Sequence, residues 1–498
     1  MFPLQDDIAT PVSHHFADQQ LGTQLAAFSD TLELRDNGIE PPKNAHTNLI
    51  YHSEVDAAVE WTDHERTQLA EMQSLYDPEL VSVHLASRYP EIDVQDGRFI
   101  GVGDPYDREQ LITNVEENIE TVWDIFGETP VLIENNNHLG TDAYEIVTDP
   151  SFIDTVVRRT DVGLLLDIGH AKITAHNTAV EYDDYLRQLP LDRCQQVHLS
   201  RHGYDETGAV DAHGFLTAAD WDHFDTIRSQ LPKLTYVTLE YYTDATVLAA
   251  QLERMQTGAD ETVFTHRAWE SEVFNTTVAS VTSDPTTAEC LRYAIARCAE
   301  SDVDCLIFET ESSQERDEAV AQAFELVETQ SVFEHTSDAD HSLEGADDIR
   351  PWQYTDLPHL QELAGSLYDG TPCHTDSQFD TESCDELHSL WIHHACQEAV
   401  DEVFVAIADA VPVGFSTCTV TDGVGEIRLG GVEETVSAET VGTGLLAAAV
   451  EWFRDHNVTP VRSTPQTASE QQIYRSAGFT PTAESYVLHR WFDSDTNS

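Results

Sequence analysis

The chain has 498 residues, of which 25 are Lys or Arg and 91 are Asp or Glu, so its formal net charge is −66 at pH 7. Since 40% of its residues are hydrophobic, we expect two or three folded domains and not an acidic disordered segment. The charge argues against a basic nucleic-acid groove. It is typical of a surface adapted to a cytoplasm of molar salt, where charges are screened over about 3 Å.

The cysteines and the N-terminal residues indicate a cytoplasmic protein. Eight cysteines occur, seven of them after residue 280, without a Cys-x-x-Cys pair, so we expect them to be reduced and unligated. The first residues show neither a basic start nor an apolar core, and no apolar run reaches about 18 residues. We therefore expect no signal peptide and no membrane span, and small molecules as partners. The oligomeric state stays open.

Short apolar runs alternate with acidic, helix-like segments such as 107–126 and 149–159 over the first half of the chain. Strand alternating with helix predicts parallel βαβ units. Seven such runs predict a (β/α)8 barrel over residues 1–258, with one strand that is not readable from the pattern. An open doubly wound sheet is the alternative. The runs cover residues 30–35, 48–51, 80–85, 130–134, 163–168, 196–199 and 236–239.

Side chains that bind metals stand at the ends of these runs. In Gly163–His170, three leucines are followed by Asp167 and His170, at the end of a strand where α/β enzymes keep their sites. Buried carboxylates without partners are costly, so this many of them indicate bound cations. The set exceeds the needs of one ion and predicts two or three divalent ions about 3.5–4 Å apart. The predicted ligands are His46, His84, Glu134, Asp167, His170, His198, Asp211, His213 and Glu240.

The order of these ligands resembles the xylose-isomerase-like superfamily of metal-dependent barrels. Asp167-x-x-His170, His198, Asp211-x-His213 and Glu240 follow the ligand order of type IV AP endonucleases. The stretch 163–202 is similar to the multinuclear non-heme iron-dependent oxidative enzymes, which act on cysteine-containing peptides. That family usually has Asp-x-Asn-Asn where Asp167-Ile168-Gly169-His170 stands here. The resemblance implies iron, zinc or manganese, and it leaves sugar isomerisation or epimerisation, hydrolysis at a phosphate and iron-dependent oxidation open.

A second block, residues 264–340, predicts strand, helix, strand and helix after a linker at 256–260. Its opening residues, Trp269-Glu270-Ser271-Glu272-Val273-Phe274, resemble the N-terminal half of amino-sugar N-acetyltransferases of the dTDP-fucosamine type. An acidic linker at 336–347 follows. The predicted elements are strands at 278–281 and 305–309 and helices at 286–299 and 314–327.

The last block, residues 346–498, opens with a predicted strand, turn and helix start at 349–358, followed by strands at 403–408, 413–419 and 426–432. A Gly-x-Gly turn into a helix, a strand at 460–464 and a helix that contains Tyr474 complete it. This order resembles the GNAT acetyltransferases and implies acetyl-CoA. Tyr474 would then be the general acid that protonates the leaving thiolate. Glu439 stands where the family usually has Arg or Gln. By the same resemblance, the pyrophosphate would be held at a strand-to-helix turn by the amides of Val441, Gly442, Thr443, Gly444 and Leu445.

These patterns predict an α/β protein in which a metal-dependent barrel is fused to two GNAT-like halves. The expected function is bifunctional, with a C-terminal N-acetyltransferase acting on an amine, such as that of an amino sugar, and an N-terminal multinuclear metal enzyme. One alternative is a metal-dependent phosphoesterase with a non-catalytic GNAT module. The other alternative is a binding protein in which both sites are inactive.

Overall fold

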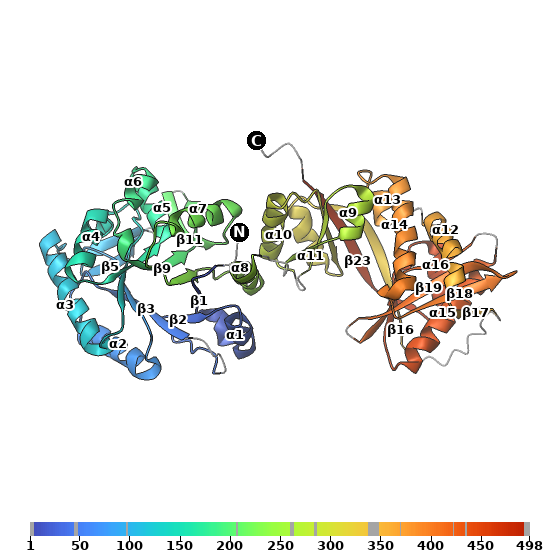
Figure 1. The fold of residues 1–498 in the computed structure, drawn as a ribbon, viewed down its shortest axis with the longest axis horizontal. Helices are drawn as coiled ribbons and strands as arrows, with labels where there is room; N and C mark the ends of the chain where they lie inside the picture. The colour runs from blue at the N-terminus through green and yellow to red at the C-terminus, as the bar shows by residue number, and fades with distance from the viewer. Residues whose placement is uncertain are drawn as a thin grey trace. The chain divides into compact units, whose positions relative to one another are not determined.

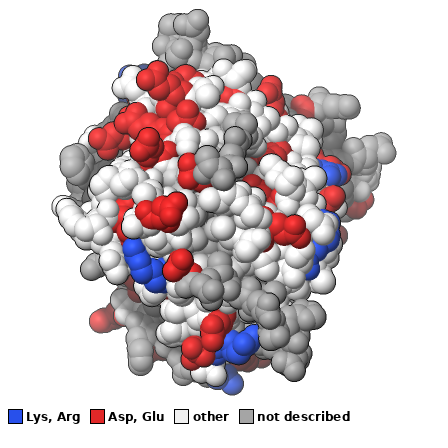
Figure 2. Space-filling view, turned by 90° about the vertical axis from the view of Figure 1, so that its right-hand side faces the viewer, with Lys and Arg blue, Asp and Glu red and all other residues white. Residues whose placement is uncertain are grey.

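The structure, a computed structural model, falls into two compact units, residues 1–263 and 264–498 (Figure 1). Among the described residues, no helix combines the length and the apolar character needed to cross a bilayer. Acidic side chains recur in several separate patches on the face drawn in Figure 2, as a solvated surface would have them. The described residues are 4–43, 48–95, 98–205, 208–258, 263–282, 286–336, 348–368, 370–421, 423–433 and 436–492.

The N-terminal unit is a closed parallel barrel, with eight strands among the described residues. The eighth strand, which the sequence pattern does not reveal, is β1. It pairs in parallel with β2 and β12 and so closes the barrel. The predicted (β/α)8 barrel is confirmed. In order around the barrel, the strands are β1 Asp7–Pro11, β2 Thr31–Leu34, β3 Asn48–Asp56, β4 Val81–His84, β7 Val131–Glu134, β8 Gly163–Asp167, β9 Cys194–Leu199 and β12 Tyr236–Leu239.

The helices of this unit begin where the sequence supplies caps. Thr62 with Glu65, and Asp107 with Gln110, form capping boxes that satisfy the first amides of α2 and α3. The apolar residues of α3 recur at helical spacing and are buried. The helices are α1 Gln19–Ala26, α2 Asp63–Tyr76, α3 Arg108–Phe126, α4 Pro150–Arg159, α5 Ile168–Asn177, α6 Tyr182–Leu186, α7 Ala218–Arg228 and α8 Ala245–Thr257, with 3-10 turns η1 His14–Ala17, η2 Asp142–Tyr144 and η3 Leu191–Arg193.

Two antiparallel hairpins are inserted after barrel strands. The hairpin β5 Glu91–Gln95 and β6 Arg98–Val102 follows β4, and the hairpin β10 Arg201–Asp205 and β11 Gly208–Gly214 follows β9. Because all barrel strands are parallel, both hairpins extend the rim at the C-terminal ends of the strands. They therefore stand beside the predicted ligands.

The C-terminal unit is built on one mixed sheet, with eleven strands among the described residues. Its order is β13-β14-β15-β23-β16-β22-β20-β19-β18-β17, and β21 pairs with β19. The strands are β13 Phe264–His266, β14 Val278–Val281, β15 Cys305–Thr310, β16 Glu325–His335, β17 Ile349–Pro351, β18 Glu402–Ala408, β19 Val411–Thr421, β20 Val424–Ile427, β21 Gly430–Val432, β22 Val461–Ser463 and β23 Thr480–Trp491.

The last strand of the chain completes the first half of this sheet. β23 lies between β15 and β16 and is antiparallel to both. The predicted boundaries at 1–258, 264–340 and 346–498 stay predictions, since the sheet runs on across the last two blocks. The helices are α9 Ala268–Phe274, α10 Ala288–Glu300, α11 Ser313–Ala321, α12 Leu357–Leu367, α13 Pro372–Thr375, α14 Thr381–His394, α15 Ala438–Asp455 and α16 Ala468–Ser476, with the short turns η4 Tyr354–Asp356 and η5 Ala395–Ala399.

Two predicted elements of this unit are wrong in part. The helix expected at 314–327 ends at Ala321, because residues from Glu325 onward pair with β23 and form β16. The single strand expected at 426–432 is divided into β20 and β21, which pair with different stretches of β19. The predicted linker at 336–347 lies almost entirely outside the described residues.

Candidate functional sites

The predicted ligands that the structure describes converge at the C-terminal rim of the barrel. His84 and Glu134 are register partners at the ends of β4 and β7, and Asp167 and His198 are register partners on β8 and β9. The others come from the first turn of α5, from β11 and from the end of β12. They are His170, Asp211, His213 and Glu240.

Short distances join these eight side chains into one cluster. Asp167 Oδ2 lies 3.9 Å from His170 Nδ1. His84 Nδ1 lies 2.7 Å from Glu134 Oε2. His198 Nδ1 lies 3.2 Å from Glu134 Oε1 and 3.4 Å from Glu240 Oε1. On the hairpin side, Asp211 Oδ2 lies 3.3 Å from both His170 Nε2 and His213 Nε2. His213 Nε2 is also 3.6 Å from Glu240 Oε2, which closes the cluster.

His46, the ninth predicted ligand, lies outside the described residues, and His52 is a histidine of this cluster that the sequence analysis missed. His52 lies on β3, with Nε2 2.8 Å from His84 Nε2 and 3.6 Å from Glu134 Oε2. The signal was present, because His52 follows directly on the apolar run 49–51. The predicted run ends at residue 51, whereas β3 continues to Asp56.

A buried arginine neutralises part of the cluster, and this residue too was missed. Arg35, just after β2, makes short contacts with both Glu33 and Glu240. Glu33 Oε2 in turn lies 3.0 Å from His198 Nε2, so the Nδ1 atom of His198 faces the centre of the cluster. Burial opposes the ionisation of Glu33, but Arg35 and then His198 outweigh it and lower its pKa to about 2. This arrangement is the carboxylate–histidine pairing that orients metal ligands.

The pKa values of other groups in the cluster are shifted in opposite directions: those of Asp167 and His198 are raised, and that of His52 is lowered. Burial raises the pKa of Asp167 to about 7, against the attraction of His170. Burial and then Arg35 hold the pKa of His52 well below its usual value. For His198, burial is outweighed by Glu240 and Glu33, which raise its pKa. Such divergent shifts within one cleft are typical of functional sites.

The donor atoms of the cluster fit divalent cations. Four groups of three side chains bring their donor atoms within 4.8 Å of one another: His52, Glu54 and His84; His52, Glu134 and His198; Glu33, His198 and Glu240; and Glu134, Asp167 and His170. Asp167 Oδ2, Asp211 Oδ1 and His198 Nδ1 are buried without a hydrogen-bond partner. Imidazole nitrogen with carboxylate oxygen suits zinc, iron and manganese. The overlap of the groups indicates room for more than one ion.

A cavity of about 980 Å³ opens above the cluster. Ile92 and Phe99 from the β5–β6 hairpin, together with Leu139, form an apolar part of its wall. Its floor contains cluster residues, among them His52 and Glu134. The volume is at the upper end of the range for ligand pockets, so it admits a molecule larger than one sugar ring.

A second cleft lies in the C-terminal unit around Tyr474. The Tyr474 hydroxyl lies 2.8 Å from Ser463 Oγ, and burial raises the pKa of the phenol to about 12. Gly442 and Leu445 of α15 and Gly431 of β21 line the same cavity, which has a volume of about 480 Å³. The phenol is therefore protonated at neutral pH and available as a proton donor.

The predicted strand-to-helix turn at the glycines is wrong. Ser437 caps α15, which begins at Ala438, and the Val441 amide already bonds to the Ser437 carbonyl at 3.0 Å. The proposed phosphate-binding amides therefore lie inside a helix, where they bond to carbonyls of the preceding turn. They are those of Val441, Gly442, Thr443, Gly444 and Leu445. The amides without an intrahelical partner belong to the first turn, before Val441. Gly442 serves packing instead, since a Cβ there would lie 3.1 Å from Ile473 Cγ2 of α16.

These two sites lie on a closed (β/α)8 barrel and on a mixed sheet of eleven described strands. Residues 55–258 match the family model of the RiPP precursor modification enzyme MbnB/TglH/ChrH. A UPF0276 protein of Rhizobium meliloti is 32% identical over 167 residues, which cover 32% of this chain and 52% of that protein. One from Anaeromyxobacter sp. is 30% identical over 169 residues, 31% of this chain and 59% of that protein. The chain thus spans about half the length of these relatives.

Solved structures of GNAT proteins resemble part of the chain. A GCN5-related N-acetyltransferase from Kribbella flavida covers 44% of this chain and 84% of its own length, at 16% identity and a TM-score of 0.33. A tandem GNAT protein from the clavulanic acid biosynthesis pathway covers 44% of this chain and 76% of its own length, at 14% identity and a TM-score of 0.31.

Proposed function

We propose that the barrel is a metal-dependent enzyme that modifies a peptide. The convergence of buried His, Asp and Glu side chains at one rim carries this conclusion, and the match of residues 55–258 to a precursor-peptide modification enzyme supports the substrate class. Bound there, iron, zinc or manganese would supply Lewis-acid or redox chemistry. The residues that would hold two or three ions are His52, His84, Glu134, Asp167, His170, His198, Asp211, His213 and Glu240.

Other residues of the chain position these ligands and the substrate. Glu33 holds His198 in place through its Nε2 atom, and Arg35 offsets the charge of Glu33 and Glu240. The Tyr242 hydroxyl donates to Glu240 Oε1 at 3.2 Å. The apolar wall of the cavity would hold side chains of a bound peptide and keep water away from them.

The test combines metal analysis with a search for a modified peptide. The full chain, purified in molar KCl, is analysed for metal and incubated with cysteine-containing peptides, which are then examined by mass spectrometry. Bound iron with a change in peptide mass is the expected result. Zinc would favour hydrolysis at a phosphate and manganese would favour sugar isomerisation. A well-folded preparation that binds no metal on reconstitution would rule out all three activities.

We propose as a second activity that the C-terminal unit transfers an acetyl group from acetyl-CoA to an amine, such as that of an amino sugar. The protonated hydroxyl of the partly buried Tyr474, in a cleft beside α15, favours it. The amine nitrogen attacks the thioester carbon, the carbon–sulfur bond breaks, and Tyr474 donates its proton to the sulfur. The amine loses its own proton to water.

Calorimetry of acetyl-CoA against the full chain in molar KCl tests this activity. Saturable binding of one acetyl-CoA per chain is expected, followed by acetylation of an amine acceptor. If the folded protein binds no acetyl-CoA, the C-terminal unit is a scaffold and not a transferase.

A further inference from the structure

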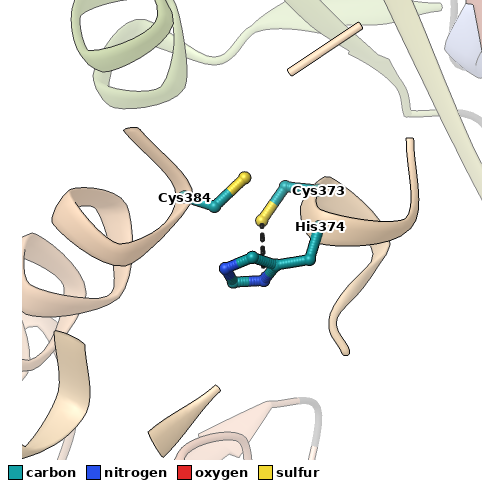
Figure 3. Close-up of side chains that lie close together, drawn as sticks. All are labelled: Cys373, His374 and Cys384. Carbon is teal, nitrogen blue, oxygen red and sulfur yellow. Dashed lines mark hydrogen bonds between the residues drawn. The ribbon is translucent and has the colours of Figure 1, made fainter. Parts of the chain in front are cut away.

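Two cysteines and a histidine, none of which lines the cleft of Tyr474, come together in the C-terminal unit. Cys373 and His374 lie on the short helix α13, and Cys384 lies on α14 (Figure 3). Their possible ligand atoms all lie within 4.8 Å of one another. Both thiols point toward the gap between the two helices (Figure 3). Cys384 is buried, and the His374 side chain is only 5% exposed.

Hydrogen bonds orient His374 within this group. Its Nε2 atom lies 3.1 Å from Asp385 Oδ1, so Nε2 donates to the carboxylate and the lone pair is on Nδ1. Nδ1 lies 3.9 Å from Cys373 Sγ and accepts a bond from the Thr371 hydroxyl at 2.7 Å, which an ion on Nδ1 would displace. Histidines that bind zinc usually donate their other ring N–H to a carboxylate in this way, which fixes the ring and its tautomer.

The distances suit a shared ion. Zinc bonds of about 2.3 Å to sulfur and about 2.0 Å to nitrogen, in tetrahedral geometry, place the two ligand atoms about 3.5 Å apart. The observed separation of Cys373 Sγ from His374 Nδ1 is 3.9 Å, so a shift of a few tenths of an ångström completes the pair. Two thiolates and an imidazole are the donor set that selects zinc over manganese or magnesium.

We propose that Cys373, His374 and Cys384 bind one divalent ion of the zinc type, with Asp385 as the residue that positions His374. Three protein ligands leave a fourth position for water or a substrate atom. Cys373 also lines a cavity of about 250 Å³, and Tyr368, Arg428, Thr464 and Gln466 line both this cavity and the cleft of Tyr474. The ion would therefore stand beside the space open to an acceptor.

The absorption of bound Co²⁺ distinguishes this site from the barrel site. The described barrel donors are nitrogen and oxygen, so the sulfur-to-cobalt charge-transfer band in the near ultraviolet arises from cysteine ligation alone. The full chain, reduced with a phosphine, is titrated with Co²⁺ and then with Zn²⁺. We expect one band per chain that Zn²⁺ abolishes. Cys373→Ser and Cys384→Ser should each lose the band, while Cys396→Ser, a buried cysteine outside the group, should keep it.

Asp385→Asn separates ligation from folding, because Asp385 is partly exposed. This variant should keep the band and bind Co²⁺ about 10- to 100-fold more weakly. The proposal is overturned if the reduced wild type shows no sulfur-to-cobalt band, or if the band persists in both Cys373→Ser and Cys384→Ser. A disulfide between these two cysteines in protein kept reduced throughout would overturn it as well.

Discussion

The barrel rim and the C-terminal cleft are built in opposite ways. At the rim, carboxylates and imidazoles from seven of the eight described barrel strands meet others from α5 and β11, and Arg35 is the cation that balances Glu33 and Glu240. In the cleft, glycines and apolar side chains alternate with dispersed polar side chains such as Ser463, Arg428 and Glu470, and they surround the phenol of Tyr474. The rim therefore depends on neutralising a dense group of charges, whereas the chemistry proposed for the cleft depends on one proton.

The largest effect is expected from Glu134→Gln, which removes a charge shared by two groups of donors. Bound metal should fall by at least one ion per chain, because both groups lose a ligand when the Glu134 carboxylate is removed. Peptide modification should be lost with the metal. Elemental analysis of wild type and variant measures it. Glu128→Gln, at an exposed position of the same unit, is the control and should leave the metal content unchanged. Equal metal in both variants would remove Glu134 from the ligand set.

Arg35→Met tests the charge balance directly. Removing the guanidinium leaves Glu33 and Glu240 buried without their cation, which should lower the free energy of unfolding by about 3–5 kcal/mol. Urea denaturation of the metal-free protein measures the change. Arg187→Met breaks an ion pair whose arginine is 67% exposed and should cost at most about 0.5 kcal/mol. Similar losses in the two variants would contradict a buried network.

Tyr474→Phe tests whether the Tyr474 hydroxyl donates the proton to the leaving thiolate. The acetylation rate should fall by about 10²- to 10⁴-fold with acetyl-CoA affinity unchanged, because only proton donation is lost. Tyr354→Phe, at a position 80% exposed, should keep the full rate. Since burial raises the pKa of Tyr474 to about 12, ionisation of this phenol should not reduce the wild-type rate between about pH 7 and pH 10. A full rate in Tyr474→Phe would assign the acid elsewhere.

The smallest effect is expected from Glu439→Gln in the first turn of α15. A carboxylate near a bound pyrophosphate costs on the order of 1 kcal/mol in water, so the variant should bind acetyl-CoA about 5-fold more tightly at low salt. Molar KCl should erase the difference by screening. Calorimetry at both salt concentrations measures this, with Glu451→Gln on the same helix as control. A gain that persists in molar salt would point to a steric cause.

The barrel could be read from the sequence because its strands are buried on both faces. Such strands are continuous apolar runs, and a polar residue at the end of one stands out, as Asp167 does after Leu164–Leu166. β1 was missed because its apolar residues are few and Pro11 interrupts the pattern. His52 was missed because it lies just past the recognised run 48–51, where local pattern does not separate a strand end from a loop. Arg35 is the last residue of the run 30–35, and its contact with Glu240 depends on β12, which is distant in sequence.

Local sequence alone determined the spacing of the apolar residues and the helix caps, since both depend on neighbours along the chain. It also supplied the acids and imidazoles at the strand ends, which a parallel barrel brings to one rim. Tertiary structure alone decided which groups share a site. The insertion of β23 between β15 and β16, the reach of Arg35 to Glu240, and the approach of Cys384 to Cys373 and His374 join residues distant in sequence or on separate helices. Packing sets those distances, and no local pattern encodes them.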